Sequence, residues 1–207
     1  MNKNKLPISL DGLLRQNIVL MSGLVTAPII VAAISAKRAL VLVISFFMIS
    51  YPSILLCRFV PKKLVYSIRI MIYAAVAAVM YIPTVIVLQI LFPETVNSVI
   101  MYIELLVVNS LLLAKTETRF YLKPYGEMAV DVLIYVLGYA VAAFLTGIVR
   151  EVLAFGTVFE YHLFDPIMPA ASSPFFGFIL VGFFAALCRL IVGRHTAGVM
   201  KQSSSDN

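Results

Sequence analysis

A few polar side chains lie inside long apolar stretches of this sequence, and their types could do chemistry. Glu104 stands in the middle of one stretch, and Asn109 and Ser110 follow it. A polar group surrounded by hydrocarbon must face protein, water or a ligand, and a carboxylate there is costly. All three are therefore candidate functional residues. For Glu104 the alternative is a neutral carboxylic acid that bonds to a carbonyl or to a neighbouring helix.

A second candidate pair, Arg150 and Glu151, comes where another apolar stretch ends. Most positively charged residues lie on the opposite side of the predicted membrane, as described below. An arginine at this position is therefore expected to have a fixed partner. Glu151 is the nearest acidic residue. Exposed pairs of this kind contribute little to stability.

Motifs typical of common enzymes are absent from the sequence. There is no nucleophile elbow, phosphate-binding loop or dinucleotide fingerprint. His162 and His195 have no metal-ligating residue at a suitable spacing. Cys57 and Cys188 are too few for a disulfide scaffold or a four-thiolate metal site within one chain, and both are expected to be small buried residues.

Composition places most of the chain outside water. Of 207 residues 62% are apolar and 13% are charged, and the mean hydropathy is +1.01. Soluble domains are about half apolar and about a quarter charged. These values exclude a disordered chain and argue against a soluble enzyme. The net charge of +6 is more typical of positive cytoplasmic loops than of a nucleic-acid partner.

Six stretches are long enough to cross a bilayer, whose apolar core needs about 20 helical residues. The sequence therefore predicts an all-α polytopic membrane protein, with residues 1–207 forming a single membrane domain in the lipid bilayer. The predicted spans are 17–35, 39–57, 70–92, 96–114, 129–149 and 174–193.

Lysine and arginine alternate strongly between the connections, which predicts the orientation because positive charge stays on the cytoplasmic side. One side collects thirteen of them and the other only Lys37, Arg38 and Arg150. Both termini are therefore predicted to be cytoplasmic. The first sixteen residues are too polar for a cleavable signal, so the first span is expected to remain.

The first and fourth spans carry the interruptions. Pro28 removes a backbone donor near the middle of the first span, where a kinked, closely packed helix is the simpler alternative to a break. The fourth span contains Glu104 and Asn109. Paired interruptions in two halves that cross in opposite directions indicate a central site, so we predict a 3+3 inverted repeat with interrupted first and fourth helices.

Four stretches resemble a known family. Gly23-Leu24-Val25 with Pro28 is similar to its Gly-Leu-Cys-Pro region, and Leu105 to Ser110 is similar to a segment ending in Thr-Asn-Cys. The family's Arg-Glu-Ile-Ile-x-x-Gly-Thr-Leu-Phe motif is matched by residues 150–159, and its entry to the last span by Met168-Pro169 and Phe176–Phe178. The chain thus resembles the integral membrane subunits of the Rnf and Nqr electron-transport complexes, closest to the RnfE/NqrD type.

The resemblance implies a role in a bacterial plasma-membrane complex. A subunit of this kind pairs with an inverted homologous subunit and assembles with further Rnf/Nqr-like subunits, some of which carry flavins. The two homologous subunits jointly hold a [2Fe-2S] cluster with four cysteines. Electron transfer through such a complex is coupled to the movement of Na⁺ or H⁺.

The two positions that correspond to cluster cysteines are Val25 and Ser110. Valine cannot ligate iron and serine is a poor substitute for a thiolate. Neither cysteine lies on a matching helix. We therefore expect the fold and assembly role of the family, with no cofactor bound by this chain alone. Two alternatives remain: the substrate-binding component of a vitamin or metabolite importer, and a stand-alone secondary transporter.

Overall fold

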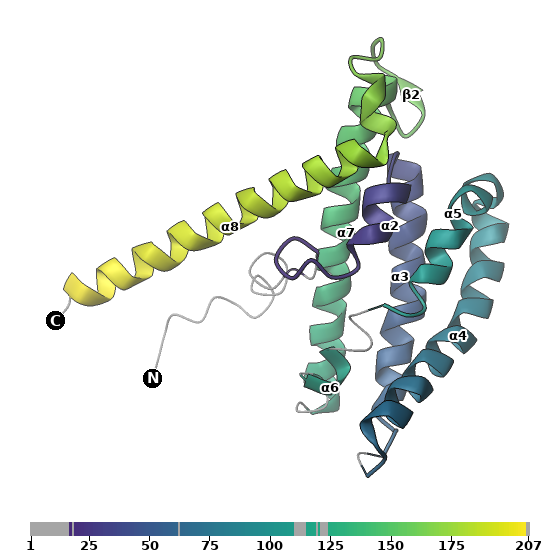
Figure 1. Cartoon of the computed structure of the whole chain (residues 1–207), viewed down its shortest axis with the longest axis vertical. Helices are drawn as coiled ribbons and strands as arrows, with labels where there is room; N and C mark the ends of the chain where they lie inside the picture. The colour runs from purple at the N-terminus through teal and green to yellow at the C-terminus, as the bar shows by residue number, and fades with distance from the viewer. Residues whose placement is uncertain are drawn as a thin grey trace.

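The computed structural model describes Asn17 and residues 19–61, 63–109, 115–118, 120 and 124–205, with side chains as far as Ile191. This part of the chain is predominantly helical (Figure 1). One short hairpin departs from the all-α expectation, because β1 (Thr157–Val158) pairs antiparallel with β2 (Tyr161–His162).

Four helices are long and apolar enough to cross a membrane, and they correspond to four of the six predicted spans. They are α3 (Ala36–Cys57), α4 (Tyr66–Leu91), α7 (Tyr125–Phe155) and α8 (Pro174–Ser205). Their apolar sequences leave few alternatives to a helix in lipid, since only a helix satisfies every backbone group within one segment. The chain is therefore a multi-pass membrane protein.

The first and fourth predicted spans are broken, as the sequence led us to expect. In their place the described residues contain α2 (Thr26–Ala32) and α5 (Pro93–Leu105), of 7 and 13 residues. At 1.5 Å per residue they extend about 10 and 20 Å, less than the apolar core of a bilayer. The six crossings, the inverted repeat and the cytoplasmic termini stay predictions.

The break before α2 is built into the backbone. Gly23 and Val25 both have positive φ angles, of 65° and 56°. Glycine adopts this conformation readily, whereas it is strained for a β-branched residue such as Val25. Pro28 lies in the first turn of α2, where its missing N–H would have no partner in any case.

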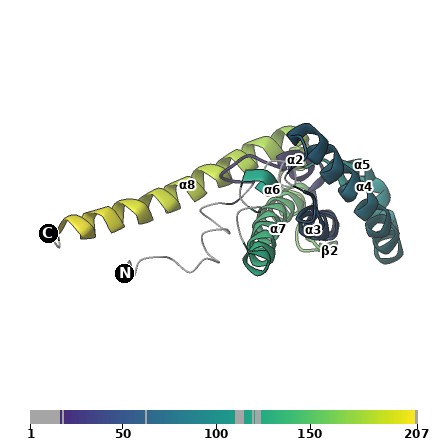
Figure 2. The ribbon, with the colours of Figure 1, turned by 90° about the horizontal axis from the view of Figure 1, so that it is seen from below.

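The core forms around α3, which packs against α7 on one side and α4 on the other (Figures 1 and 2). The ring of Phe46 stacks on that of Tyr139 with 4.2 Å between centroids. A Cβ added to Gly147 of α7 would lie 2.8 Å from the Cβ of Ala39, so these helices meet at small residues. In contrast, α8 leaves the bundle at a wide angle and has most of its described side chains exposed.

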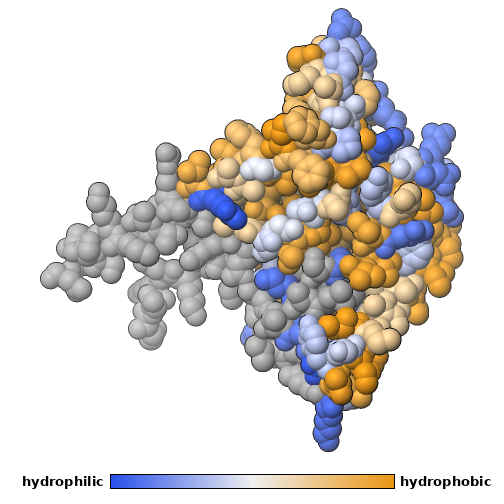
Figure 3. Space-filling model, in the orientation of Figure 1, coloured by the Kyte–Doolittle hydropathy of each residue, from blue (hydrophilic) through white to orange (hydrophobic). Residues whose placement is uncertain are grey.

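The two ends of the bundle differ from its middle. The α2–α3 junction, the α4–α5 turn and the hairpin lie at one end, and the α3–α4 connection and α6 (Thr116–Thr118) lie at the other (Figure 1). Hydrophobic side chains cover much of the visible middle, whereas hydrophilic ones gather at the tips (Figure 3). This distribution is typical of a protein whose middle is in lipid or against another apolar protein.

Candidate functional site

The two helix breaks meet in one pocket, which we call the break pocket. Its volume is about 210 Å³. The start of α2 and the end of α5 supply its walls, through Val25, Thr26, Ala27, Pro28, Leu105, Val108 and Asn109. Non-helical backbone at membrane depth is tolerated where it is buried in protein or lines a cavity. The pocket therefore explains where these two interruptions are accommodated.

Asn109 fixes one wall of the break pocket. It is buried at 3% exposure, and its side-chain amide donates to the Oγ of Ser50 on α3 at 3.0 Å. The same amide donates to the carbonyl of Leu106 at 2.5 Å, within the turn that ends α5. Asn109 thus closes the broken helix and fastens it to the central helix. Ser110, the neighbouring candidate, lies outside the described residues.

Glu104 is exposed on the outside of the bundle and does not line the break pocket. The hydroxyl of Tyr81 on α4 donates to its Oε1 at 3.2 Å. Of the alternatives raised by the sequence, the contact with a neighbouring helix is present. A bond to a backbone carbonyl is not recorded for it within the described part of the chain.

Arg150 is fully buried and binds five backbone carbonyls. The predicted pairing with Glu151 is wrong, because Glu151 is not among its recorded partners in the described chain. The guanidinium nitrogens lie 2.7 to 3.3 Å from carbonyl oxygens of Ile30, Ala33, Ala171, Ser172 and Ser173. All five N–H donors are therefore used, and they join the end of α2 to η4 (Pro169–Ser172) and the start of α8.

Glu151 accepts hydrogen bonds from a different set of segments, the start of α3 and the hairpin. Its Oε2 accepts from the backbone N–H of Ala36 at 2.6 Å. Its Oε1 accepts from the hydroxyl of Thr157 and the backbone N–H of Glu160. A carboxylate near a helix N-terminus is also favoured by the helix dipole. At 1% exposure, Glu151 is no member of a surface pair.

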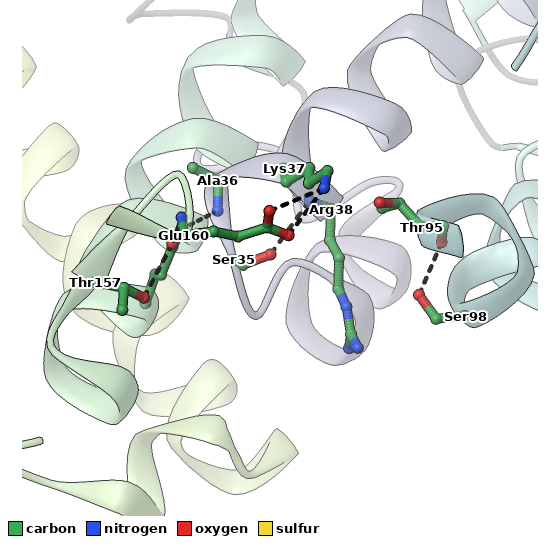
Figure 4. Close-up of polar contacts among 9 residues, drawn as sticks. Ser35, Ala36, Lys37, Arg38, Thr95, Ser98, Thr157 and Glu160 are labelled. Atoms are coloured by element: carbon green, nitrogen blue, oxygen red, sulfur yellow. Dashed lines mark hydrogen bonds and ion pairs between the residues drawn. The ribbon is translucent and has the colours of Figure 1, made fainter. Parts of the chain in front are cut away.

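The hairpin turn shows what this carboxylate holds in place. Phe159 and Glu160 have φ angles of 50° and 68°, which are unfavourable for residues other than glycine. The bond from Glu160 N to Glu151 fixes this turn, and the Glu160 side chain meets Lys37 at 2.9 Å (Figure 4). We call Arg150 and Glu151 the Arg–Glu clasp, since together they tie five segments at one end of the bundle: the end of α2, η4, the start of α8, the start of α3 and the hairpin.

Two further polar contacts were not predicted from the sequence. The Asn17 amide donates to the carbonyl of Gly138 on α7 at 2.8 Å and anchors the chain ahead of the first break. Glu117 of α6 accepts from Arg69 at 2.8 Å and from Tyr73 at 2.5 Å. Each contact fastens a short or non-helical segment to a long helix, Asn17 to α7 and α6 to α4. The polarity of these residues was a visible signal, but their partners are distant in sequence.

Comparison with known proteins assigns the chain to a family. Residues 6–185 match the sequence model of the family described as Rnf-Nqr subunit, membrane protein. The chain belongs to the Rnf-Nqr family. The match runs over most of the sequence, through the break pocket and the Arg–Glu clasp alike. No curated protein matches the sequence. Membership of the Rnf-Nqr family confirms the resemblance and implies other Rnf/Nqr subunits as partners.

The resemblance described above implies a [2Fe-2S] cluster, and the residues around the break pocket show whether such a cluster would fit there. Among the described residues that line the pocket there is no Cys, His, Asp or Glu. Val25 offers only hydrocarbon, and the Asn109 amide is engaged by protein oxygens. Cys57 lies at the far end of α3, and Cys188 lies on α8. These residues do not fit a cluster held by thiolates.

Proposed function

We propose that this chain is the membrane subunit of an Rnf/Nqr-like complex that couples electron transfer to Na⁺ or H⁺ translocation, and that it has diverged at the [2Fe-2S] positions. Family membership supports the assembly role. The observation that carries the proposal is the break pocket, where Val25 and Asn109 bring together the two segments that resemble the cluster motifs.

In this proposal the chain acts as a scaffold within the electron-transfer core. An inverted homologous subunit lies against the break pocket, and flavins are carried by partner subunits. This chain supplies neither of its two family thiolates, because Val25 and Ser110 occupy those positions. The complex resides in the bacterial plasma membrane with both termini of this chain in the cytoplasm.

The test is purification of the intact complex from its native membranes through a tag on this chain. Redox subunits should co-purify, and addition of the electron donor to membrane vesicles should drive cation uptake. Absence of both would overturn the assembly role. Co-purifying ATPase subunits with metabolite uptake would support an importer instead.

The divergence is tested separately by Ser110→Ala in the same complex. The iron content and the paramagnetic-resonance spectrum should match those of the unsubstituted complex, because Ser110 is proposed to hold no iron. Ser172→Ala serves as a serine control, because Ser172 does not line the break pocket and its side chain bonds locally to the carbonyl of Pro169. Loss of one cluster signal in Ser110→Ala alone would show that the cluster is retained.

A further inference from the structure

The outward side of α5 carries a carboxyl group at membrane depth. Tyr81 precedes the end of α4 by ten residues, or about 15 Å of helix, which is half of an apolar core of about 30 Å. Since the Tyr81 hydroxyl binds Glu104, the carboxyl group lies near the middle of the membrane. Glu104 is nevertheless exposed on the bundle surface.

A carboxyl group at this depth is not accommodated by lipid. Ionisable residues within membrane segments face protein or a water-filled cavity, and they are paired. Tyr81 supplies one hydrogen bond, from a neutral donor and to Oε1 only. Within the described chain no contact of the second oxygen, Oε2, is recorded. Glu104 is exposed, so the remaining acceptor capacity of its carboxyl group is available to a partner outside the bundle.

The surroundings of Glu104 have the character of a contact surface. Met101, Glu104 and Leu105 share one side of α5, because they are spaced by three and four residues. Val108 follows in the next turn. Met101, Leu105 and Val108 are 74%, 53% and 61% exposed, so a single acidic group lies among large apolar side chains. Leu105 and Val108 also line the break pocket, so this surface adjoins its wall.

We propose that Met101, Glu104, Leu105 and Val108, which we call the Glu104 face, dock a membrane helix of a partner subunit that presents a positively charged side chain to Glu104. Charge complementarity selects this occupant, since a cation completes the pairing that Tyr81 cannot supply. Burial of the apolar residues around the pair excludes water from it. Glu104 therefore determines which subunit this chain accepts at the Glu104 face, beside the break pocket.

This inference rests on the proposed complex for the existence of its partner, and it is tested by photo-crosslinking in native membranes. A benzoylphenylalanine at Leu105 should crosslink to a transmembrane segment of a co-purifying subunit. Mass spectrometry should find Lys, Arg or His within one helical turn of the crosslinked position. Crosslinks to lipid alone, to a second copy of this chain, or to a segment with no such residue would overturn the proposal.

Substitution then tests the charge. Glu104→Gln keeps an oxygen for Tyr81 but replaces the ionisable carboxyl group by a neutral amide, and it should lower retention of the partner by at least about tenfold. Glu94→Gln, at an exposed position in the first turn of the same helix, should leave retention unchanged. Equal retention in the two variants would overturn the proposal.

A charge exchange separates pairing from folding. Glu104→Lys should release the partner, and replacement of the crosslinked basic residue by Glu should restore retention. No recovery, with the helical content of the chain unchanged, would overturn the pairing.

The proposed function and the docking at the Glu104 face can fail independently. If redox subunits co-purify while the Glu104 face contacts lipid, only this inference fails; if a basic membrane helix docks without any redox subunit, only the proposed function fails.

Discussion

Replacement of Arg150 by Met tests how much of the fold depends on the Arg–Glu clasp. Methionine fills similar space but removes five hydrogen bonds to carbonyls from three segments. Hydrogen bonds between membrane helices contribute about 0.6 kcal/mol each on average. The five together give a loss of about 3 kcal/mol in the free energy of unfolding. Arg150→Lys keeps at most three donors, so it should lose about 1 kcal/mol.

The measurement is an SDS titration of the detergent-solubilised chain, followed by far-ultraviolet circular dichroism because the sequence contains no tryptophan. Hydrogen exchange should show which segments loosen: residues 30–36 and 171–177 should exchange faster, and the middle of α3 should not. Arg189→Met is the matched control, since Arg189 is exposed on α8 and should change stability by less than about 0.5 kcal/mol. If Arg150→Met lost no more than Arg189→Met, the clasp would not hold these segments together.

Three further substitutions, one of them with a matched glycine control, probe the contacts around the breaks. Glu151→Gln should destabilise the chain by about 1–3 kcal/mol in the same titration, because an amide nitrogen would face a backbone N–H or a hydroxyl that now has an acceptor. Gly177→Ala should lower stability by about 1–3 kcal/mol, since its Cβ would lie 2.4 Å from the carbonyl oxygen of Ile30. Gly182→Ala, with nothing within 4 Å, should be neutral or slightly stabilising. Asn109→Ala should cost about 1–2 kcal/mol by freeing the end of α5, and a cysteine label at Val108 should then react faster.

Each of these predictions has a result that contradicts it. Glu151→Gln at unchanged stability would mean that the hairpin and α3 do not depend on its charge. Gly177→Ala as stable as Gly182→Ala would show that α8 does not approach α2 closely. Unchanged labelling at Val108 in Asn109→Ala would show that the amide does not hold this wall of the pocket.

Much of the fold could be predicted because the apolar character of a segment, which decides whether it can span a membrane, is a property of consecutive residues. The starts of α3, α4 and α7 precede their predicted spans by three or four residues. The sequence also indicated that the first and fourth spans are interrupted. Pro28 predicts that the first break lies at the proline. The strained residue is instead Val25, three positions earlier. Sequence patterns do not show that a β-branched residue is held in a left-handed conformation.

The candidate residues were predicted less completely than the fold. Their polarity marked them, but their partners depend on contacts between distant segments. Arg150 binds carbonyls of Ile30 and Ala33, which are 120 and 117 residues away. Every residue carries a carbonyl, so no side-chain pattern reveals such acceptors. The nearest acidic side chain, Glu151, was therefore a misleading guide.

The sequence by itself determined that this is a multi-pass membrane protein of the Rnf-Nqr type and marked two apolar stretches as the places of possible interruption, because apolar length and backbone-breaking residues are local properties. Only the tertiary structure decided that the breaks meet in one pocket, that Arg150 and Glu151 form a clasp, and that Glu104 points outward. The direction of a side chain depends on the rotation of its helix against its neighbours, and that rotation is fixed by packing between segments far apart in the chain.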